Sequence, residues 1–188
     1  MRRFVDNTFV DQHAPTIGAE FFRKDVEVEG QRVQIQFWDT SGQELFKSMA
    51  TSFYKNGHAA ILVYSVASRK TFENIQYWLK EVRDHADSNV KIFLLGNKID
   101  LKDAREVSLE EGQEFAKEHS LFFMEVSALT NENDCMAKAL EMISKEIHHN
   151  AKSVQWDQSK TQGKQTELIL SDSITERVQE RRGDCCSR

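Results

Sequence analysis

The chain has 188 residues, a length that fits one domain with an extension better than two full domains. Hydrophobic residues make up 39% and charged residues 29%, with eight glycines and one proline, so the composition excludes collagen-like, low-complexity and largely disordered proteins. The net charge of -5, without a block of Lys and Arg, excludes a nucleic-acid-binding protein.

The lengths of the apolar stretches and the number of cysteines indicate in which cellular compartment the chain is found. No apolar run approaches the ~20 residues that cross a bilayer, and no such run follows Arg2 and Arg3, so we expect neither a membrane span nor a signal peptide. Three cysteines are too few for a disulfide framework. We therefore expect a reducing, cytosolic environment.

Strand-like and helix-like runs alternate from Ala19 to Ser127. The first pair is a hairpin, because alternating valines end at a Glu29-Gly30 turn and Val33, Ile35 and Phe37 alternate after it. Further strands are predicted where short runs are rich in Val, Ile, Leu and Phe, at Ala60–Val66, Lys91–Leu95 and Phe122–Val126. Strands alternating with helices predict an α/β, doubly wound fold.

Three helices are predicted between and after these strands. Apolar residues recur every three or four positions from Phe72 to Val82 and from Met136 to Ile147. Ser108, followed three residues later by Glu111, is a capping-box pattern that starts a helix running to about Glu118.

The periodicity fades after about Asn150. We interpret residues 1–150 as the folded domain and residues 151–188 as a flexible tail of Ser, Gln, Thr and charged residues. The apolar residues from Leu168 to Val178 leave open a short helix that docks on a partner, but a solvated linker is favoured.

Asn97-Lys98-Ile99-Asp100 follows a predicted buried strand, where the carboxyl edge of a sheet can line a ligand crevice. The Asp100 carboxylate can accept two hydrogen bonds from guanine, whereas adenine lacks that donor pattern. Taken alone, the four residues are equally typical of a turn at a strand end.

A second segment, from Trp38 to Glu44, also follows a predicted strand. Asp39 can hold a water on Mg²⁺, Gly42 lets a backbone N-H approach a γ-phosphate, and Gln43 can orient a water for in-line attack. The alternative is a strand exit with Asp and Gly as turn formers.

Two weaker elements complete the set. Thr16 lies in a predicted loop and offers a hydroxyl as a hard oxygen ligand to Mg²⁺, although a lone Thr is usually only a loop residue. Ser127 and Ala128 follow a strand and can present backbone N-H groups to a base carbonyl.

With these four elements in this order, residues 4–150 resemble the small Ras-like GTPases, which share a P-loop NTPase G domain. The Ile17–Phe21 segment, the Trp38–Glu44 string and the Phe53-Tyr54-Lys55 triplet are similar to the Rab branch of vesicle-traffic regulators. Ser41 departs from the Ala usual in the family and Leu129 from the frequent Lys, which affects one base-stacking contact.

The resemblance implies GTP or GDP with Mg²⁺ as cofactors and assigns a role to each candidate residue. Thr16 is the implied magnesium ligand, Asp39 and Gly42 are the phosphate-side residues, and Gln43 is the implied catalytic glutamine. The guanine base is assigned to Asn97, Lys98, Asp100, Ser127 and Ala128.

The last residues resemble Rab termini. Cys185 and Cys186 match the paired cysteines that carry two geranylgeranyl groups, and two chains make a stable anchor where one is marginal. The alternative is a pair of exposed thiols. Lipidation is favoured and implies the cytosolic face of an intracellular membrane.

The family's phosphate loop, Gly-x-x-x-x-Gly-Lys-Ser/Thr, is missing, because no two of the eight glycines lie five positions apart. Met1 to Val5 resembles the last turn of the helix after that loop, so we expect the family's first strand and phosphate loop to be absent. In this fold the first strand lies between the strands of Phe37 and Val63, whose backbone groups then lose partners.

Two functions remain open, and with them the question of enzymatic GTP hydrolysis. One is a Rab-type switch in an N-terminally shortened form, a monomer whose partners are effectors at the switch regions, an exchange factor, a GTPase-activating protein and a prenyl-carrying escort. The other is a nucleotide-independent, lipidated interaction module or non-catalytic isoform. Both exclude a nucleic-acid partner.

Overall fold

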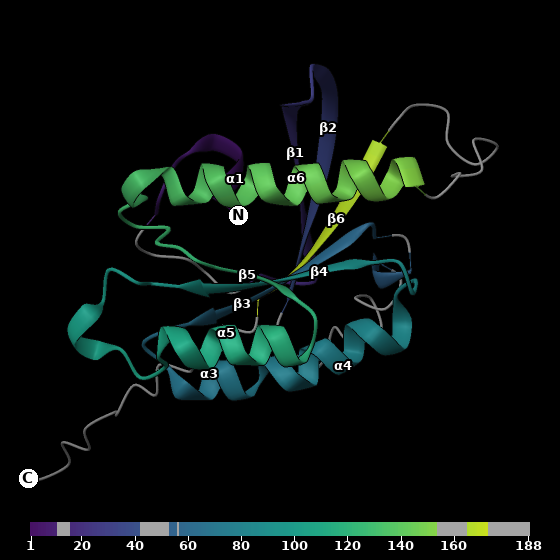
Figure 1. Ribbon diagram of the computed structural model, residues 1–188. Helices are drawn as coiled ribbons and strands as arrows, with labels where there is room; N and C mark the ends of the chain where they lie inside the picture. Colours follow the sequence, from purple (N-terminus) through teal and green to yellow (C-terminus); the bar gives the residue numbers. More distant parts are fainter. Residues whose placement is uncertain (11–15, 42–52, 56, 154–164, 173–188) are drawn as a thin grey trace, which may run out of the picture.

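The computed structural model describes residues 1–10, 16–41, 53–55, 57–153 and 165–172, with side chains up to position 150. A six-stranded sheet in the order β1-β2-β6-β3-β4-β5 forms the middle layer (Figure 1). Its strands are β1 (Ala19–Val28), β2 (Gln31–Thr40), β3 (Ala59–Ser65), β4 (Lys91–Asn97), β5 (Phe122–Glu125) and β6 (Gln165–Asp172). Of the strand pairs in the described residues, only β1-β2 is antiparallel, so the expected mostly parallel α/β fold is confirmed.

The predicted hairpin joins β1 and β2. Val26 pairs with Val33 and Val28 with Gln31, and the turn residues Glu29 and Gly30 have φ values of 51° and 75°. A two-residue turn with both φ values positive matches the twist of the flanking strands, and Gly adopts this conformation without steric cost.

Helices cover both faces of the sheet (Figure 1). One face carries α1 (Arg2–Asp6) and α6 (Cys135–Ser153), and the other carries α3 (Arg69–Glu73), α4 (Ile75–His85) and α5 (Leu109–Glu118). Two short 3₁₀ turns, η2 (Lys102–Ala104) and η3 (Glu132–Asp134), precede α5 and α6. None of the helices in the described part is long and apolar enough to cross a membrane.

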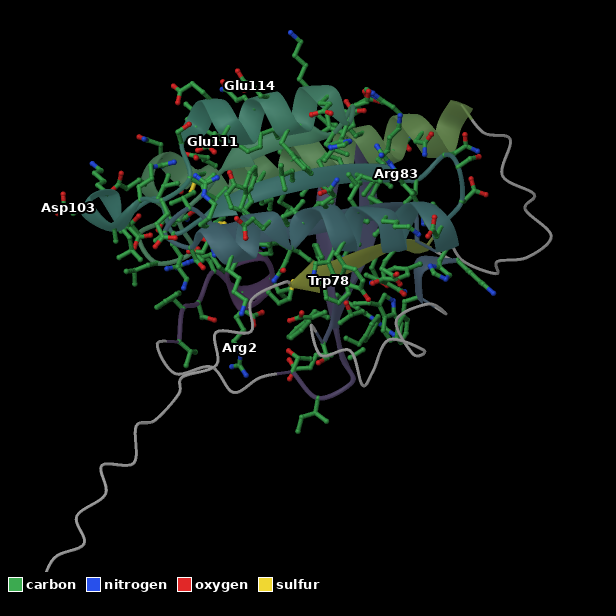
Figure 2. The ribbon with its side chains drawn as sticks, turned by 90° about the horizontal axis from the view of Figure 1, so that it is seen from below. Arg2, Trp78, Arg83, Asp103, Glu111 and Glu114 are labelled. Carbon is green, nitrogen blue, oxygen red and sulfur yellow. The ribbon has the colours of Figure 1, made fainter. Side chains whose placement is uncertain are left out.

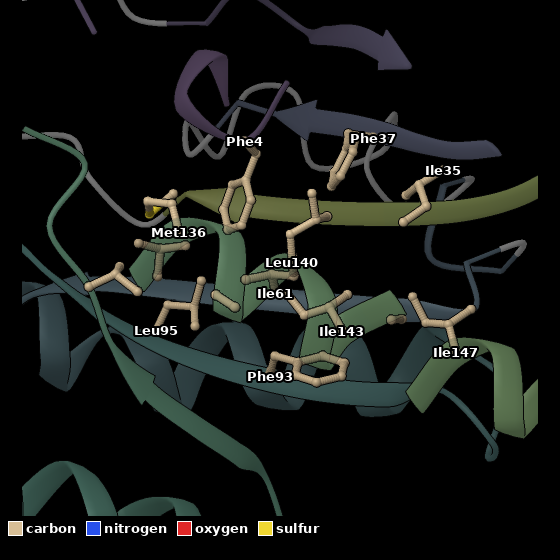
Figure 3. Packing of buried hydrophobic residues seen from close by; sticks show 14 residues of the cluster. Phe4, Ile35, Phe37, Ile61, Phe93, Leu95, Met136, Leu140, Ile143 and Ile147 are labelled. Atoms are coloured by element: carbon tan, nitrogen blue, oxygen red, sulfur yellow. The ribbon is translucent and has the colours of Figure 1, made fainter. Parts of the chain in front are cut away.

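Each helical layer buries its own apolar cluster against the sheet. Phe4 of α1 and Ile143 of α6 pack with Phe37, Ile61 and residues of β4 on one face (Figure 3). The other cluster joins β3 and β4 to the apolar residues of α4 that the spacing predicted. The first cluster therefore needs β2 and β3 to be held at a fixed separation.

The predicted capping box is present at the start of α5. The Glu111 backbone N-H donates to Ser108 Oγ at 3.1 Å, and the Ser108 backbone N-H donates to Glu111 Oε2 at 3.0 Å. Arg69, hydrogen-bonded to the same carboxylate, and the Ser108 N-H lower the pKa of Glu111 to about 2. The predicted helix from Ser108 to about Glu118 is confirmed.

Strand β6 is the main difference from the sequence-based expectation. Residues 165–172, assigned to a flexible tail, form a parallel strand between β2 and β3, the position expected to lack a strand. The expectation failed here because a polar composition with a short apolar run does not reveal a pairing partner more than a hundred residues away. For the other residues after position 153, the tail stays a prediction.

Under α5, the side chain of Tyr64 packs closely against two glycines, Gly96 and Gly112. A Cβ atom at Gly112 would lie 2.6 Å from Tyr64 Oη and 2.7 Å from Phe123 Cζ, and one at Gly96 would lie 2.9 Å from Tyr64 Oη. Tyr64 is fully buried, its hydroxyl has no hydrogen-bond partner among the described residues, and burial raises its pKa. Glycine is therefore required at position 112 by close packing.

We predict that Gly112→Ala lowers the free energy of unfolding by about 1–3 kcal/mol, because overpacking outweighs the gain in helix propensity of up to ~1 kcal/mol. Gln113→Ala, at the exposed neighbouring position of the same helix, is the matched control. Urea denaturation of both variants measures the difference. A Gly112→Ala protein as stable as the Gln113→Ala control contradicts the packing argument.

Candidate functional site

The candidate segments meet at one edge of the sheet. Strands β2, β3, β4 and β5 all end there, because they are parallel to one another through β6, and β1 starts there opposite Thr40. Asp39 near the end of β2 and Asn97 at the end of β4 are three strand spacings apart across the sheet, about 14 Å. Asn97 also lies four residues, about 13 Å, further along the strand direction, because Asp39 is level with Phe93. The edge is therefore wide enough for an extended ligand that touches both.

Asn97 ties together the two segments after β4 and β5. Its Oδ1 accepts a hydrogen bond from the Lys98 backbone N-H at 2.8 Å and another from the Ala128 backbone N-H at 3.1 Å. The Ile99 backbone N-H reaches the Val126 carbonyl at 3.5 Å. The Asn97 amide thus positions the two loops relative to each other.

Asp100 and Ser127 form the second link. The Ser127 hydroxyl donates to Asp100 Oδ1 and accepts a hydrogen bond from the Thr130 backbone N-H at 3.0 Å. Ser127 is fully buried, so its hydroxyl is held in one orientation. One carboxylate oxygen is thereby positioned by the protein, which leaves Asp100 Oδ2 as an acceptor in a defined place.

Lys98 has a left-handed backbone conformation, with φ at 69°. A non-glycine residue in this region costs of order 1–3 kcal/mol and persists where surrounding contacts determine it, which is common at ligand sites. The Asn97 and Asp100 contacts on either side supply that determination.

The other half of the edge holds Asp39 and Thr16. Asp39 is 3% exposed at the end of β2, and the Ser41 backbone N-H donates to the Gly18 carbonyl at 2.9 Å, which holds the segment before β1 against the end of β2. Thr16 is partly exposed. A hydroxyl and a carboxylate are both hard oxygen donors, the ligand type that Mg²⁺ prefers.

A sequence model of the Ras family matches residues 1–149. The chain belongs to the Ras family. It is 40% identical to both the "Ras-related protein Rab2BV" of Beta vulgaris and the "Ras-related protein RABA2b" of Arabidopsis thaliana; each match covers the whole chain and 86% of the relative. The "Ras-related protein YPTC6" of Chlamydomonas reinhardtii is 38% identical with similar coverage. These relatives confirm the resemblance to the Rab branch and support a small-GTPase role.

Several predicted site residues of this Ras-family chain lie outside the described residues. They are Gly42, Gln43, Cys185 and Cys186. The structure brings together Asn97, Lys98, Asp100, Ser127 and Ala128 in one network, and it places Thr16 and Asp39 at the same edge. The roles of all these residues remain predictions.

Arg3 is a site component that the sequence analysis missed. Its Nε donates to the Ala128 carbonyl at 2.6 Å, its Nη2 to the Leu129 carbonyl at 2.7 Å and its Nη1 to the Asn7 carbonyl at 2.8 Å. The guanidinium also lies 5.9 Å from the centre of the exposed Phe9 ring. No local pattern reveals this role, because Arg3 and Ala128 are 125 positions apart.

An aromatic row lies beside the Asp39 half of the edge. Phe21 and Trp38 have ring centroids 4.6 Å apart, and Trp38 and Phe53 are 4.7 Å apart. Ile17, just before β1, is 81% exposed. The Ras-family chain therefore presents a partly exposed apolar surface next to its candidate site.

We predict that Arg3→Ala destabilises the loop after β5 by about 1–3 kcal/mol, since charge-assisted hydrogen bonds to two loop carbonyls are lost. Hydrogen exchange of residues 127–131 should accelerate. Arg2→Ala is the control, because Arg2 is exposed and, among the described residues, makes no hydrogen bond to this loop (Figure 2). Equal exchange in the two variants contradicts the positioning role of Arg3.

Proposed function

We propose that this chain is a Rab-type, guanine-nucleotide-dependent switch of vesicle trafficking at the cytosolic face of intracellular membranes. The observation that carries the proposal is the Asp100-Ser127 and Asn97-Ala128 network. It joins two loops from different strands around a carboxylate whose one oxygen is fixed by a buried hydroxyl. A turn at a strand end needs no such link.

Guanine is the base that this network suits. A carboxylate at Asp100 accepts from the N1-H and the exocyclic amine of guanine, and the Ala128 segment offers backbone donors for its carbonyl. Adenine lacks these donors and would leave Asp100 Oδ2 unpaired, which is costly and produces large discrimination. Lys98 and Asn97 complete the wall of the base site.

The proposed phosphate side of the site lacks the sequence motif that usually holds the phosphates. The 188 residues contain no Gly-x-x-x-x-Gly-Lys-Ser/Thr segment, which would hold the β- and γ-phosphates. Thr16 and Asp39 are the proposed holders of Mg²⁺, with Gly42 on the phosphate side and Gln43 orienting the attacking water. Bound Mg²⁺ would supply neutralisation of the phosphate charge. We infer that this chain binds GTP and GDP weakly and hydrolyses GTP poorly.

Partner binding is assigned to the surface beside the site. Ile17 and the Phe21-Trp38-Phe53 row offer apolar area for effectors, next to the loops that nucleotide would order. An exchange factor and a GTPase-activating protein would act at the same edge. Cys185 and Cys186 are the proposed sites of two prenyl groups, delivered by an escort protein and serving as the membrane anchor.

Fluorescent GDP titrated into the purified chain with Mg²⁺ tests the base site. We predict affinity weaker than micromolar, preference for guanine over adenine nucleotides, and a further loss of about tenfold to a hundredfold in Asp100→Asn, because hydrogen bonds to a charged group are worth ~1.5–3 kcal/mol. Asp103→Asn removes the same charge from an exposed position three residues along and is the control. Unchanged selectivity in Asp100→Asn contradicts the base-site assignment, and micromolar or tighter binding contradicts the inferred impairment.

A nucleotide-independent, lipidated interaction module is the second candidate. The exposed Ile17 and the aromatic row favour it, because an apolar surface can bind a partner without nucleotide. The same titration separates the two functions. Saturable guanine-specific binding supports the switch, and no detectable binding by a folded chain supports the module.

A further inference from the structure

The middle of the sheet is completed by a segment far along the chain. Gln34 to Thr40 of β2 pair with Gln165 to Ser171 of β6, and Ala59 to Val63 of β3 pair with Leu168 to Asp172. No direct β2-β3 pairing occurs among the described strands. Among the described residues, strand β6 is therefore the only link through backbone pairing between the β1-β2 hairpin and the β3-β4-β5 part of the sheet.

The residues on both sides of β6 are deeply buried. Ile35 and Phe37 of β2 are at most 1% exposed, and Ala59 to Ile61 of β3 are at most 2% exposed. With β6 absent, their backbone donors and acceptors would face a gap of two strand spacings, about 10 Å, away from water. The apolar cluster under α6 spans that gap, since it contains Phe37 and Ile61 together (Figure 3).

The sequence of the segment suits the position. A central parallel strand is apolar on both faces, and Leu168-Ile169-Leu170 is a consecutive apolar run between polar ends. Eleven residues, 154–164, connect the end of α6 to the start of β6. At ~3.3–3.6 Å per residue they can span at most about 40 Å. They do not have to cross the length of the sheet, because Asn150 near the end of α6 donates to the Asn89 carbonyl just before β4, and Gln165 pairs with Gln34 near the start of β2.

We propose that Gln165–Asp172 is a self-complementing strand: the chain's C-terminal arm fills the slot between β2 and β3 of the same molecule, and the domain depends on it to fold. The slot is thus a docking surface for an extended, parallel segment, and its occupant is this chain's own arm. The interaction is β-strand addition within one polypeptide.

The arm then leaves the sheet at the edge of the candidate site. Strand β6 ends at Asp172, beside Val63 and one position beyond the Ser171-Thr40 pair. Thirteen residues, 173–185, connect it to Cys185, a reach of at most about 45 Å. If Cys185 and Cys186 carry the lipid groups proposed above, the edge of the sheet with the candidate site would lie within that distance of the membrane surface.

Hydrogen exchange of the unlipidated full chain, read by mass spectrometry without nucleotide, tests the strand separately from the proposed function. We expect backbone amides of residues 165–172 to be protected to the same degree as those of β3, in a monomer by light scattering. Fast exchange of 165–172 beside a protected β3 overturns the proposal. Protection in a dimer overturns the claim of an arm from the same molecule and shows exchange between two copies.

Leu168→Pro in the full chain provides the second test. Leu168 pairs with Phe37 and with Ala59, and proline removes a ladder donor from a central strand. We expect loss of protection in β2 and β3 together, or loss of the folded protein altogether. Thr175→Pro, beyond the strand, is the matched control and should behave as the unsubstituted chain. Equal protection of β2 and β3 in the two variants overturns the proposal.

Discussion

Backbone donors and acceptors in the middle of a buried sheet must be paired, and this constraint governs the structure of the chain. The backbone N-H and C=O groups on the facing edges of β2 and β3 lie under helices, where water does not reach them. If no strand lay between β2 and β3, several of these groups would be buried without a hydrogen-bond partner, and each would cost free energy. Strand β6 meets the requirement with a parallel register on both sides. Net stabilities of ~5–15 kcal/mol leave little room for such a gap.

The same strand aligns the site. Because β2, β6, β3, β4 and β5 are all parallel, their carboxyl ends fall on one edge, and Asp39, Asn97 and Ser127 are brought to it from three different strands. The base half of that edge is cross-linked by side-chain hydrogen bonds that do not require a ligand. The other half holds the buried carboxylate of Asp39 and the hydroxyl of Thr16.

Local patterns predicted what local interactions determine. The Glu29-Gly30 turn, the Ser108-Glu111 capping box and the strand exits at Asn97 and Ser127 depend on residues within a few positions, and all are present. Long-range features were not accessible in this way. The pairing of Leu168 with Ala59 joins positions more than a hundred residues apart, and the mostly polar sequence around Leu168 gave no sign of a buried strand. The contact of Arg3 with Ala128 was missed for the same reason.

The central claim is that the edge formed by the Asn97 and Ser127 loops binds a guanine nucleotide. Backbone amide chemical shifts of the isotope-labelled chain, followed by NMR as GDP and Mg²⁺ are added, test it most directly. The account predicts the largest changes at residues 97–100 and 127–129, with ADP producing none there. Changes confined to other faces of the molecule, or identical changes with ADP, would contradict it.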